Sequence, residues 1–299
     1  MIKTKQNPAQ QTYINKISFK QKMKNYKKHP ASFIMMCLVL LSAAFTAFVL
    51  IYLIGYILAK GIPNLSPELF EWKYTSENVS MMPAIVNTVS MTALSLIFSV
   101  PIGIFSAIYL VEYARRGNKL VSAVRMTTET LSGIPSIVYG LFGYLMFNIA
   151  FGWGYSLLGG ALTLAIMILP LIMRTTEEAL LAVPDSYREG SFGLGAGRLR
   201  TVFKIVLPAA VPGILSGIIL GIGRIVGETA ALIYTSGTVT GIPKNVMGSG
   251  RTLSVHMYAL LSEGLYTEQA HATAVVLLFL VLIINGISSF AAKKLGTKS

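Results

Sequence analysis

The sequence predicts an all-α polytopic membrane protein with six transmembrane helices. The chain of 299 residues is 54% hydrophobic and only 12% charged, whereas soluble domains carry roughly 25% charged residues. Long stretches without any charge recur along the chain, and a helix needs roughly 20 apolar residues to cross a bilayer. The distribution of the basic residues, given below, favours placing both termini in the cytoplasm.

The first two transmembrane helices are expected in the N-terminal part of the chain. Residues 31–59 are free of charge and exceed the length of a single crossing. After an external loop over residues 60–83, the second helix is expected from Ala84 to about Val111. Pro101 is expected to bend this helix without ending it, because neighbouring helices can satisfy the carbonyl group that a proline leaves unbonded.

The remaining helices follow from the length of the next apolar runs. Residues 130–173 contain no charge, and as one helix they would be about 66 Å long, twice the thickness of the bilayer core. They therefore predict a third and a fourth helix, with a turn at Gly152-Trp153-Gly154. The fifth helix is expected to start near Ala209, and the sixth to span about residues 272–292.

The basic residues predict which side of the membrane each loop faces. With both termini in the cytoplasm, 20 basic residues lie on the cytoplasmic side and four on the external side, which is the usual bias. The four are Lys60, Lys73, Lys244 and Arg251. Residues 1–30 are Lys-rich without any acid, so we expect a cytoplasmic tail that contacts anionic membrane lipids, and a second short tail at 293–299. This topology accounts for the net charge of +13 and argues against a nucleic-acid partner.

The polar segment 174–208 contains a motif with a defined spacing. It reads Glu189-Gly190-Ser191, three further residues, Gly195, nine residues, and then Ile205-Val206-Leu207-Pro208. The glycines weaken a helix by about 1 kcal/mol each, but they leave a low surface that a partner can approach closely. Taken alone, the spacing is also compatible with a Gly-rich polar loop that has no partner.

A short helix is expected inside this segment. Pro184 ends the helix before it, and Ser186 and Glu189 have the spacing of a capping box, which predicts a helix that begins near Tyr187. The second half of the segment has apolar residues at helical spacing, which we expect to face the membrane. They are Leu199, Val202, Phe203 and Val206.

The fifth helix combines small residues with two charges. Glycines four residues apart allow membrane helices to approach closely, and we expect this packing role for Gly213, Gly217, Gly221, Gly223 and Gly227. Arg224 and Glu228 are also four apart, which predicts a shared helical face. Because charges inside a membrane are costly, the pair is expected to face a protein-lined path or a partner. A purely structural ion pair is the alternative.

Three further segments match a known family together with the motif at 189–208. They are Thr128–Gly143, Arg174–Leu180 and Gly227–Ala230. With the motif at 189–208, they resemble the membrane subunits of phosphate importers of the PstA type over roughly residues 84–292. The family has two alanines where this chain has Gly190-Ser191. The resemblance implies the type I ABC importer permease fold, also called MetI-like, with a core of five helices at 84–292 and a cytoplasmic docking loop at 174–208.

The resemblance also implies the partners and the cellular location. A second homologous permease subunit would complete a heterodimer in the bacterial inner membrane, two ATPase subunits would bind from the cytoplasm, and an external phosphate-binding protein would deliver inorganic phosphate. The residues expected to dock the ATPase are Ser186, Glu189, Gly190, Ser191, Gly195, Ile205, Leu207 and Pro208. The residues expected along the substrate path are Arg224, Glu228 and Thr229. Arg174 is more readily explained as a topogenic anchor than as a substrate ligand.

The sequence predicts that this chain is a transport subunit and not an enzyme. It has no Gly-rich loop ending in Gly-Lys-Ser or Gly-Lys-Thr, which an ATPase needs to hold phosphates and magnesium, so ATP and magnesium are expected on the partner ATPase. His29, His256 and His271 share no ligand spacing, and we assign no catalytic residue, metal ligand or cofactor.

Three alternative functions remain open. The chain can belong to an importer of another oxyanion, such as sulfate or molybdate, because those importers share the docking motif. It can be an ATP-independent channel or ion-driven carrier, in which Arg224 and Glu228 form a selectivity or proton-relay pair. It can also be a membrane scaffold that tolerates neutral residues at both positions.

The external segment 237–271 contains one further predicted element. Apolar residues at 253–261 are spaced as in a short amphipathic helix. Such a helix can form an outer gate, seat a binding protein, or lie on the membrane surface.

Overall fold

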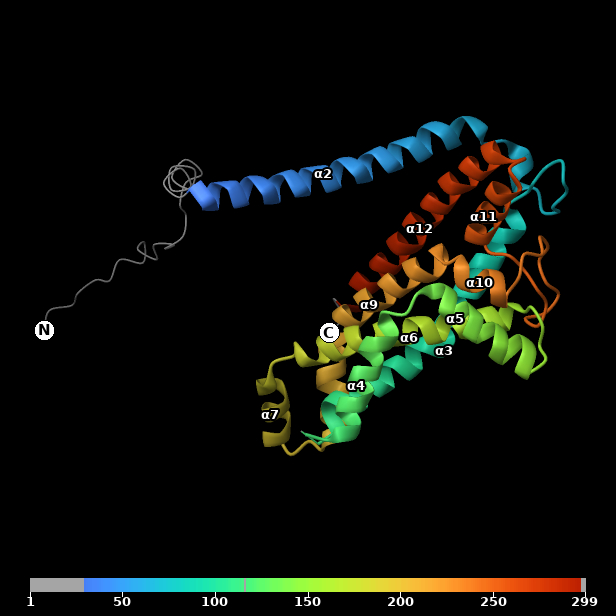
Figure 1. Ribbon diagram of the computed structural model, residues 1–299. Helices are drawn as coiled ribbons and strands as arrows, with labels where there is room; N and C mark the ends of the chain where they lie inside the picture. The colour runs from blue at the N-terminus through green and yellow to red at the C-terminus, as the bar shows by residue number, and fades with distance from the viewer. Residues whose placement is uncertain (1–29, 116, 297–299) are drawn as a thin grey trace, which may run out of the picture. The chain divides into compact units, whose positions relative to one another are not determined.

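The computed structural model describes residues 30–115 and 117–296 (Figure 1). All regular elements in these ranges are helices. Five of them are long and apolar enough to cross a membrane, and a bent pair of shorter helices makes a sixth candidate. The predicted tail at 1–30 lies outside the described residues except for Pro30, and the tail at 293–299 is described only to residue 296.

The chain divides into two units, residues 1–56 and residues 57–299. The described part of the first unit is most of α2 (Pro30–Gly61), which covers the predicted first transmembrane helix. Its large apolar side chains are exposed, for example Phe45 at 69% and Ile51 at 71%. α2 is long and apolar enough to cross a membrane.

Four long helices form the bundle of the second unit. α3 (Met82–Ile108) continues as the π-helix η3 (Tyr109–Tyr113), and it packs on α6 (Leu157–Leu181). α6 packs on α9 (Leu207–Gly227), and α9 packs on α12 (Thr267–Gly296). A core between α3, α6, α9 and the short α10 (Ala230–Thr235) includes the fully buried Met91, Leu164, Ile168, Ile225 and Leu232. This core positions the functional residues described below.

Prolines stand inside three of these helices without ending them. Pro101 lies in α3, Pro170 in α6 and Pro212 in α9. Each removes one backbone donor, and surrounding helices and hydroxyl groups can compensate at membrane depth. The expectation for Pro101 is confirmed, because α3 runs through it for seven more residues to Ile108.

The third membrane segment is a bent pair of helices, whereas a single third helix was expected between residue 130 and the turn at 152–154. α4 (Lys119–Ser132) and α5 (Ser136–Gly143), which continues as the π-helix η4 (Tyr144–Ala150), are bent by 104°. The bend lies just before Pro135, which disfavours helical geometry at the preceding residue. The predicted turn at 152–154 is present, with positive φ at Gly152 and Gly154.

Short elements close the end of the bundle opposite α7 (Asp185–Gly193), as Figure 1 shows. They are η1 (Ile62–Asn64), η2 (Pro67–Phe70), α10 (Ala230–Thr235) and α11 (Leu253–Glu263). Leu253, Val255, His256 and Leu260 of α11 are each at most 1% exposed. The predicted short helix is therefore present, and this chain itself buries these four residues, while Tyr258 and Leu261 of the same helix are 50% and 49% exposed.

Candidate functional site

The first part of the site is α7, the short helix predicted in the polar segment. It begins at Asp185, with the extended Pro184 as its N-cap residue and no side-chain capping bond. The predicted capping box of Ser186 and Glu189 is therefore wrong, because Ser186 falls inside the first turn. Proline needs no bond for its missing N–H and sets the entry of the chain into the helix by its own geometry.

Gly195 ends α7 for a conformational reason. Its φ is +79°, a left-handed conformation that glycine adopts without steric cost. The Gly195 N–H donates to the Phe192 carbonyl at 2.9 Å, and the Ala196 N–H donates to the Ser191 carbonyl at 3.1 Å. These two bonds close the helix end. The spacing of the motif thus places a glycine where the backbone requires one.

α7 and the residue after it expose large apolar side chains beside glycines that leave room for a partner. Tyr187 is 52% exposed, Phe192 47% and Leu194 91%. A Cβ atom added at Gly190 or Gly193 would meet nothing within 4 Å. Exposed aromatic and aliphatic side chains beside small residues are typical of a surface that receives a partner.

The second half of the polar segment joins this helix to the bundle. α8 (Arg198–Thr201) continues through the π-helix η5 (Val202–Val206) into α9. Val202 and Val206 are buried in a core cluster between the ends of α3 and α6. Leu199 and Phe203, which were expected on the same membrane-facing side, are 67% and 39% exposed. Only half of the predicted apolar stripe therefore packs.

The motif residues Ile205, Leu207 and Pro208 mark the start of the fifth transmembrane helix. Pro208 lies in the first turn of α9. It has no N–H to bond the carbonyl four residues earlier, and that carbonyl lies in η5, where the backbone has the wider π geometry. The Ser191 hydroxyl lies 2.8 Å from the Thr201 hydroxyl and connects the two halves of the segment.

Arg188 and Glu112 form a largely buried ion pair between α7 and the end of α3. Their closest nitrogen and oxygen atoms are 2.7 Å apart, and the side chains are 15% and 8% exposed. No prediction from the sequence covered this pair, since 76 residues separate the two. The position of Glu112 directly after the apolar run that ends at Val111 was the signal that could have indicated a partner for its carboxylate.

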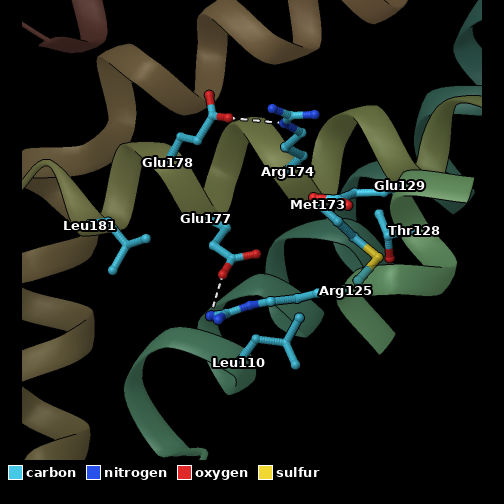
Figure 2. Close-up of a pocket in the computed structure, with 9 residues that line it drawn as sticks. All are labelled: Leu110, Arg125, Thr128, Glu129, Met173, Arg174, Glu177, Glu178 and Leu181. Carbon is cyan, nitrogen blue, oxygen red and sulfur yellow. Dashed lines mark hydrogen bonds and ion pairs between the residues drawn. The ribbon is translucent and has the colours of Figure 1, made fainter. Parts of the chain in front are cut away.

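A second charged cluster lies between α4 and the end of α6 (Figure 2). Figure 2 shows Arg125 of α4 pointing at Glu177 of α6, with which it forms an ion pair. Within α6, Arg174 Nε donates to Glu178 Oε1 at 3.0 Å, across one turn of the helix. Glu129 also lines this pocket, whose volume is about 240 Å³. Exposed pairs of the Arg174–Glu178 type stabilise a helix only slightly, while the Arg125–Glu177 pair ties the bent segment to α6.

Arg224 lies in the last turn of α9 and is half-buried. It lines a groove of about 710 Å³ with Leu171 of α6, Ser216 and Leu220 of α9, and Asn285 of α12. The Asn285 Oδ1 atom is buried and accepts no hydrogen bond from the described residues. Arg224 and Asn285 thus line one groove within a membrane segment, although the Asn285 oxygen itself is buried.

Glu228 does not share a helical face with Arg224, so that expectation is wrong. α9 ends at Gly227, Glu228 has extended geometry, and α10 starts two residues later. Glu228 Oε1 accepts a bond from the Ala231 N–H at 3.2 Å, and its carbonyl accepts one from Ser254 Oγ at 2.6 Å. Among the described residues, no ion pair joins it to Arg224.

Thr229 follows Glu228 in the break between α9 and α10. Its carbonyl accepts bonds from the N–H groups of Leu232 and Ile233, each at 3.1 Å. Glu228 and Thr229 therefore hold the start of α10, and both lie close in sequence to the Arg224 groove.

The glycines of α9 fall into two groups. A Cβ atom at Gly213 would lie 2.7 Å from the Ala179 Cβ, and one at Gly217 would overlap Thr175 of α6. Gly221 is looser, with Ile168 at 3.9 Å. A Cβ at Gly223 or Gly227 would meet nothing within 4 Å, so the packing expected of these two is not found among the described residues.

Comparisons with known proteins agree with this architecture. Residues 99–297 match the family described as the binding-protein-dependent transport system inner membrane component. The probable ABC transporter permease protein YqgI of Bacillus subtilis (strain 168) is 34% identical over 275 residues, covering 86% of this chain and 92% of that protein. The phosphate transport system permease protein PstA of Pasteurella multocida (strain Pm70) is 34% identical over 256 residues, covering 84% and 91%.

Solved structures confirm the predicted fold class. A bacterial ABC transporter involved in the import of the acidic polysaccharide alginate has a chain that matches with a TM-score of 0.64 at 17% identity, covering 92% of this chain and 99% of that one. The MetNI methionine ABC transporter matches with a TM-score of 0.57 at 20% identity, covering 74% and 99%. At these identities the likeness shows the fold alone.

Proposed function

We propose that this chain, which belongs to the family of binding-protein-dependent transport system inner membrane components, forms half of the membrane path of an importer for inorganic phosphate. The observation that carries the proposal is the 34% identity to a phosphate transport permease across 84% of the chain. A second relative named as a phosphate transport system permease protein, PstA of Mycobacterium leprae (strain TN), is 30% identical over 81% of the chain.

The energy for import comes from a partner that docks at α7. The exposed Tyr187, Phe192 and Leu194 and the open glycine positions support this assignment. Two ATPase subunits bind ATP and magnesium, a second homologous permease completes the path, and an external phosphate-binding protein delivers the substrate. In this arrangement α7 is cytoplasmic and α11 external, and both termini of the chain are cytoplasmic, as the positive-inside bias favours.

Arg224 is the group that receives the anion inside the membrane. A guanidinium binds two phosphate oxygens at once, and charge-assisted bonds of this kind are stronger than neutral ones. The Arg224 groove gives room for a small anion. Glu228 and Thr229 belong to the path as the residues that hold the helix break beside this groove.

Uptake into vesicles tests the substrate and the energy source together. The complete complex is reconstituted with its ATPase and binding protein, and labelled phosphate is supplied with excess sulfate or molybdate. We expect uptake that requires ATP and resists both competitors. Competition by sulfate or molybdate would identify another oxyanion importer, and uptake without nucleotide would identify a channel or an ion-driven carrier.

Disulfide or bifunctional cross-linking tests the docking site. In a Cys37→Ser background, Ser191→Cys and Leu194→Cys are expected to cross-link to the ATPase subunit. Tyr258→Cys on α11 is the matched control, because it is 50% exposed but lies at the other end of the bundle. If only the control reacts with the ATPase in a complex that hydrolyses ATP, the assigned docking site is wrong.

A further inference from the structure

We infer that Arg188 couples the docking helix to the transmembrane helices by holding the ends of α3 and α6 at once. The inference rests on the proposed docking of an ATPase at α7. On one side, Arg188 Nη2 donates to Glu112 Oε1 at 2.7 Å, and Nε donates to the same oxygen at 3.2 Å. Glu112 lies in η3, which continues α3 without a break. α7 is thereby tied to the α3 end by a fork of two charge-assisted bonds.

The same guanidinium also holds the end of α6. Nη1 donates to the Val183 carbonyl at 2.8 Å, and Nη2 donates to the Leu180 carbonyl at 2.9 Å. The last carbonyl groups of a helix have no partner within the helix and need one from outside. A cation at a helix C-terminus also interacts favourably with the helix dipole. Arg188 therefore satisfies carbonyl groups at the α6 end while it pairs with α3.

A role in transmission explains why a charged pair is buried here. Replacing a buried ion pair by well-packed apolar residues is often neutral for stability, so stability alone does not require the pair. The directed bonds, however, fix the geometry. α7 cannot shift relative to the two helix ends without breaking bonds in a mostly desolvated site, so a displacement of α7 moves both ends.

The packed bundle carries such a displacement onward. α3 and α6 are in close contact, with the Gly103 backbone against Ile172. α6 in turn packs on α9, where Gly217 lies against Thr175. α9 carries Arg224 in its last turn. A contiguous chain of packed elements therefore links the docking helix to the residue proposed to bind the anion.

The test separates coupling from assembly by measuring phosphate uptake and ATP hydrolysis in the same vesicles. Glu112→Gln keeps the side-chain volume and removes the charge. We expect the ratio of phosphate transported to ATP hydrolysed to fall about tenfold, within the range of coupling between distinct sites, while the cross-link from Leu194→Cys persists. Asp185→Asn is the matched control: Asp185 contacts the same guanidinium at 3.2 Å but is 81% exposed, so the ratio is expected to stay unchanged.

A second variant keeps the inference testable if the first destabilises the protein. Arg188→Lys keeps the charge that pairs with Glu112 but loses the planar fork that reaches the Val183 and Leu180 carbonyls at the same time, so it is expected to fold with a reduced transport ratio. A normal ratio in either variant, with the cross-link intact, overturns the coupling role alone. Absence of the Leu194→Cys cross-link in the otherwise unaltered chain contradicts the docking proposal instead, and the inference with it.

Discussion

Gly140 of α5 lies directly against the backbone of Ala231 of α10. A Cβ atom at position 140 would stand 2.8 Å from the Ala231 Cα and 3.1 Å from its carbonyl oxygen. No side chain in this contact can rotate away to make room, so the backbone itself must move. The Ala231 N–H is also the donor to Glu228 Oε1. The bent third segment therefore supports the break that follows α9.

Gly140→Ala is expected to destabilise the protein by about 1–3 kcal/mol, the usual cost of overpacking. Gly286→Ala on α12 is the matched control, because both glycines are helical and a Cβ at 286 meets nothing within 4 Å. Alanine is the better helix former by about 1 kcal/mol, so the control should be neutral or stabilising. Thermal unfolding of the two purified variants measures the difference, and equal midpoints would contradict the close contact.

Arg224→Gln is expected to abolish phosphate uptake while the complex still assembles, because it removes the cation from the groove. Arg224→Lys keeps the charge but loses the planar fork, so partial uptake at most is expected. Since no ion pair joins Arg224 to Glu228, adding Glu228→Gln to Arg224→Gln should not restore transport. Near-normal uptake in that double variant would show that the two residues act only as a pair.

His256 is expected to make the protein less stable in acid. Burial, and then the charge of Arg251, lower the pKa of His256 from 6.5 to about 3. The folded protein therefore holds a neutral imidazole where the unfolded chain binds a proton below about pH 6.5, and stability falls as the pH drops from there towards 3. Between about pH 7.5 and pH 5, this loss is on the order of 2 kcal/mol.

The measurement for His256 is the unfolding midpoint as a function of pH. His256→Gln cannot take up the proton, so its midpoint should vary less between about pH 7.5 and pH 5 than that of the unaltered protein. Leu261→Gln on the same helix, which changes a residue that binds no proton and is 49% exposed, should keep the original pH dependence. An identical slope in His256→Gln and the unaltered protein would rule out His256 as the source.

Reporter fusions are expected to follow the bias of 20 to four basic residues. Fusions after Lys119, Leu199 and Ser299 should report a cytoplasmic location. Those after Tyr74 and Lys244 should report an external one. A reporter found on the opposite side at any of these positions breaks the six-helix topology.

The positions of most elements followed from the sequence because they depend on local properties. The lengths of the apolar runs located α2, α3, α6, α9 and α12, since a membrane helix must keep a minimum length of apolar residues. The short helix α7 was expected near Tyr187 and begins at Asp185. Its terminating glycine also needed no tertiary information, because the left-handed conformation at Gly195 is a requirement of the local backbone.

Only the tertiary structure decided where some helices end and which charged residues pair. The end of α9 at Gly227 and the pair of Glu112 with Arg188 depend on contacts between residues distant in sequence. Periodicity assumes an unbroken helix, so it placed Arg224 and Glu228 on one face. It has no means to detect that Ala231 and Ser254 provide Glu228 with hydrogen bonds outside the helix. Hydrophobicity and spacing set which segments cross the membrane, whereas packing sets which charged groups meet.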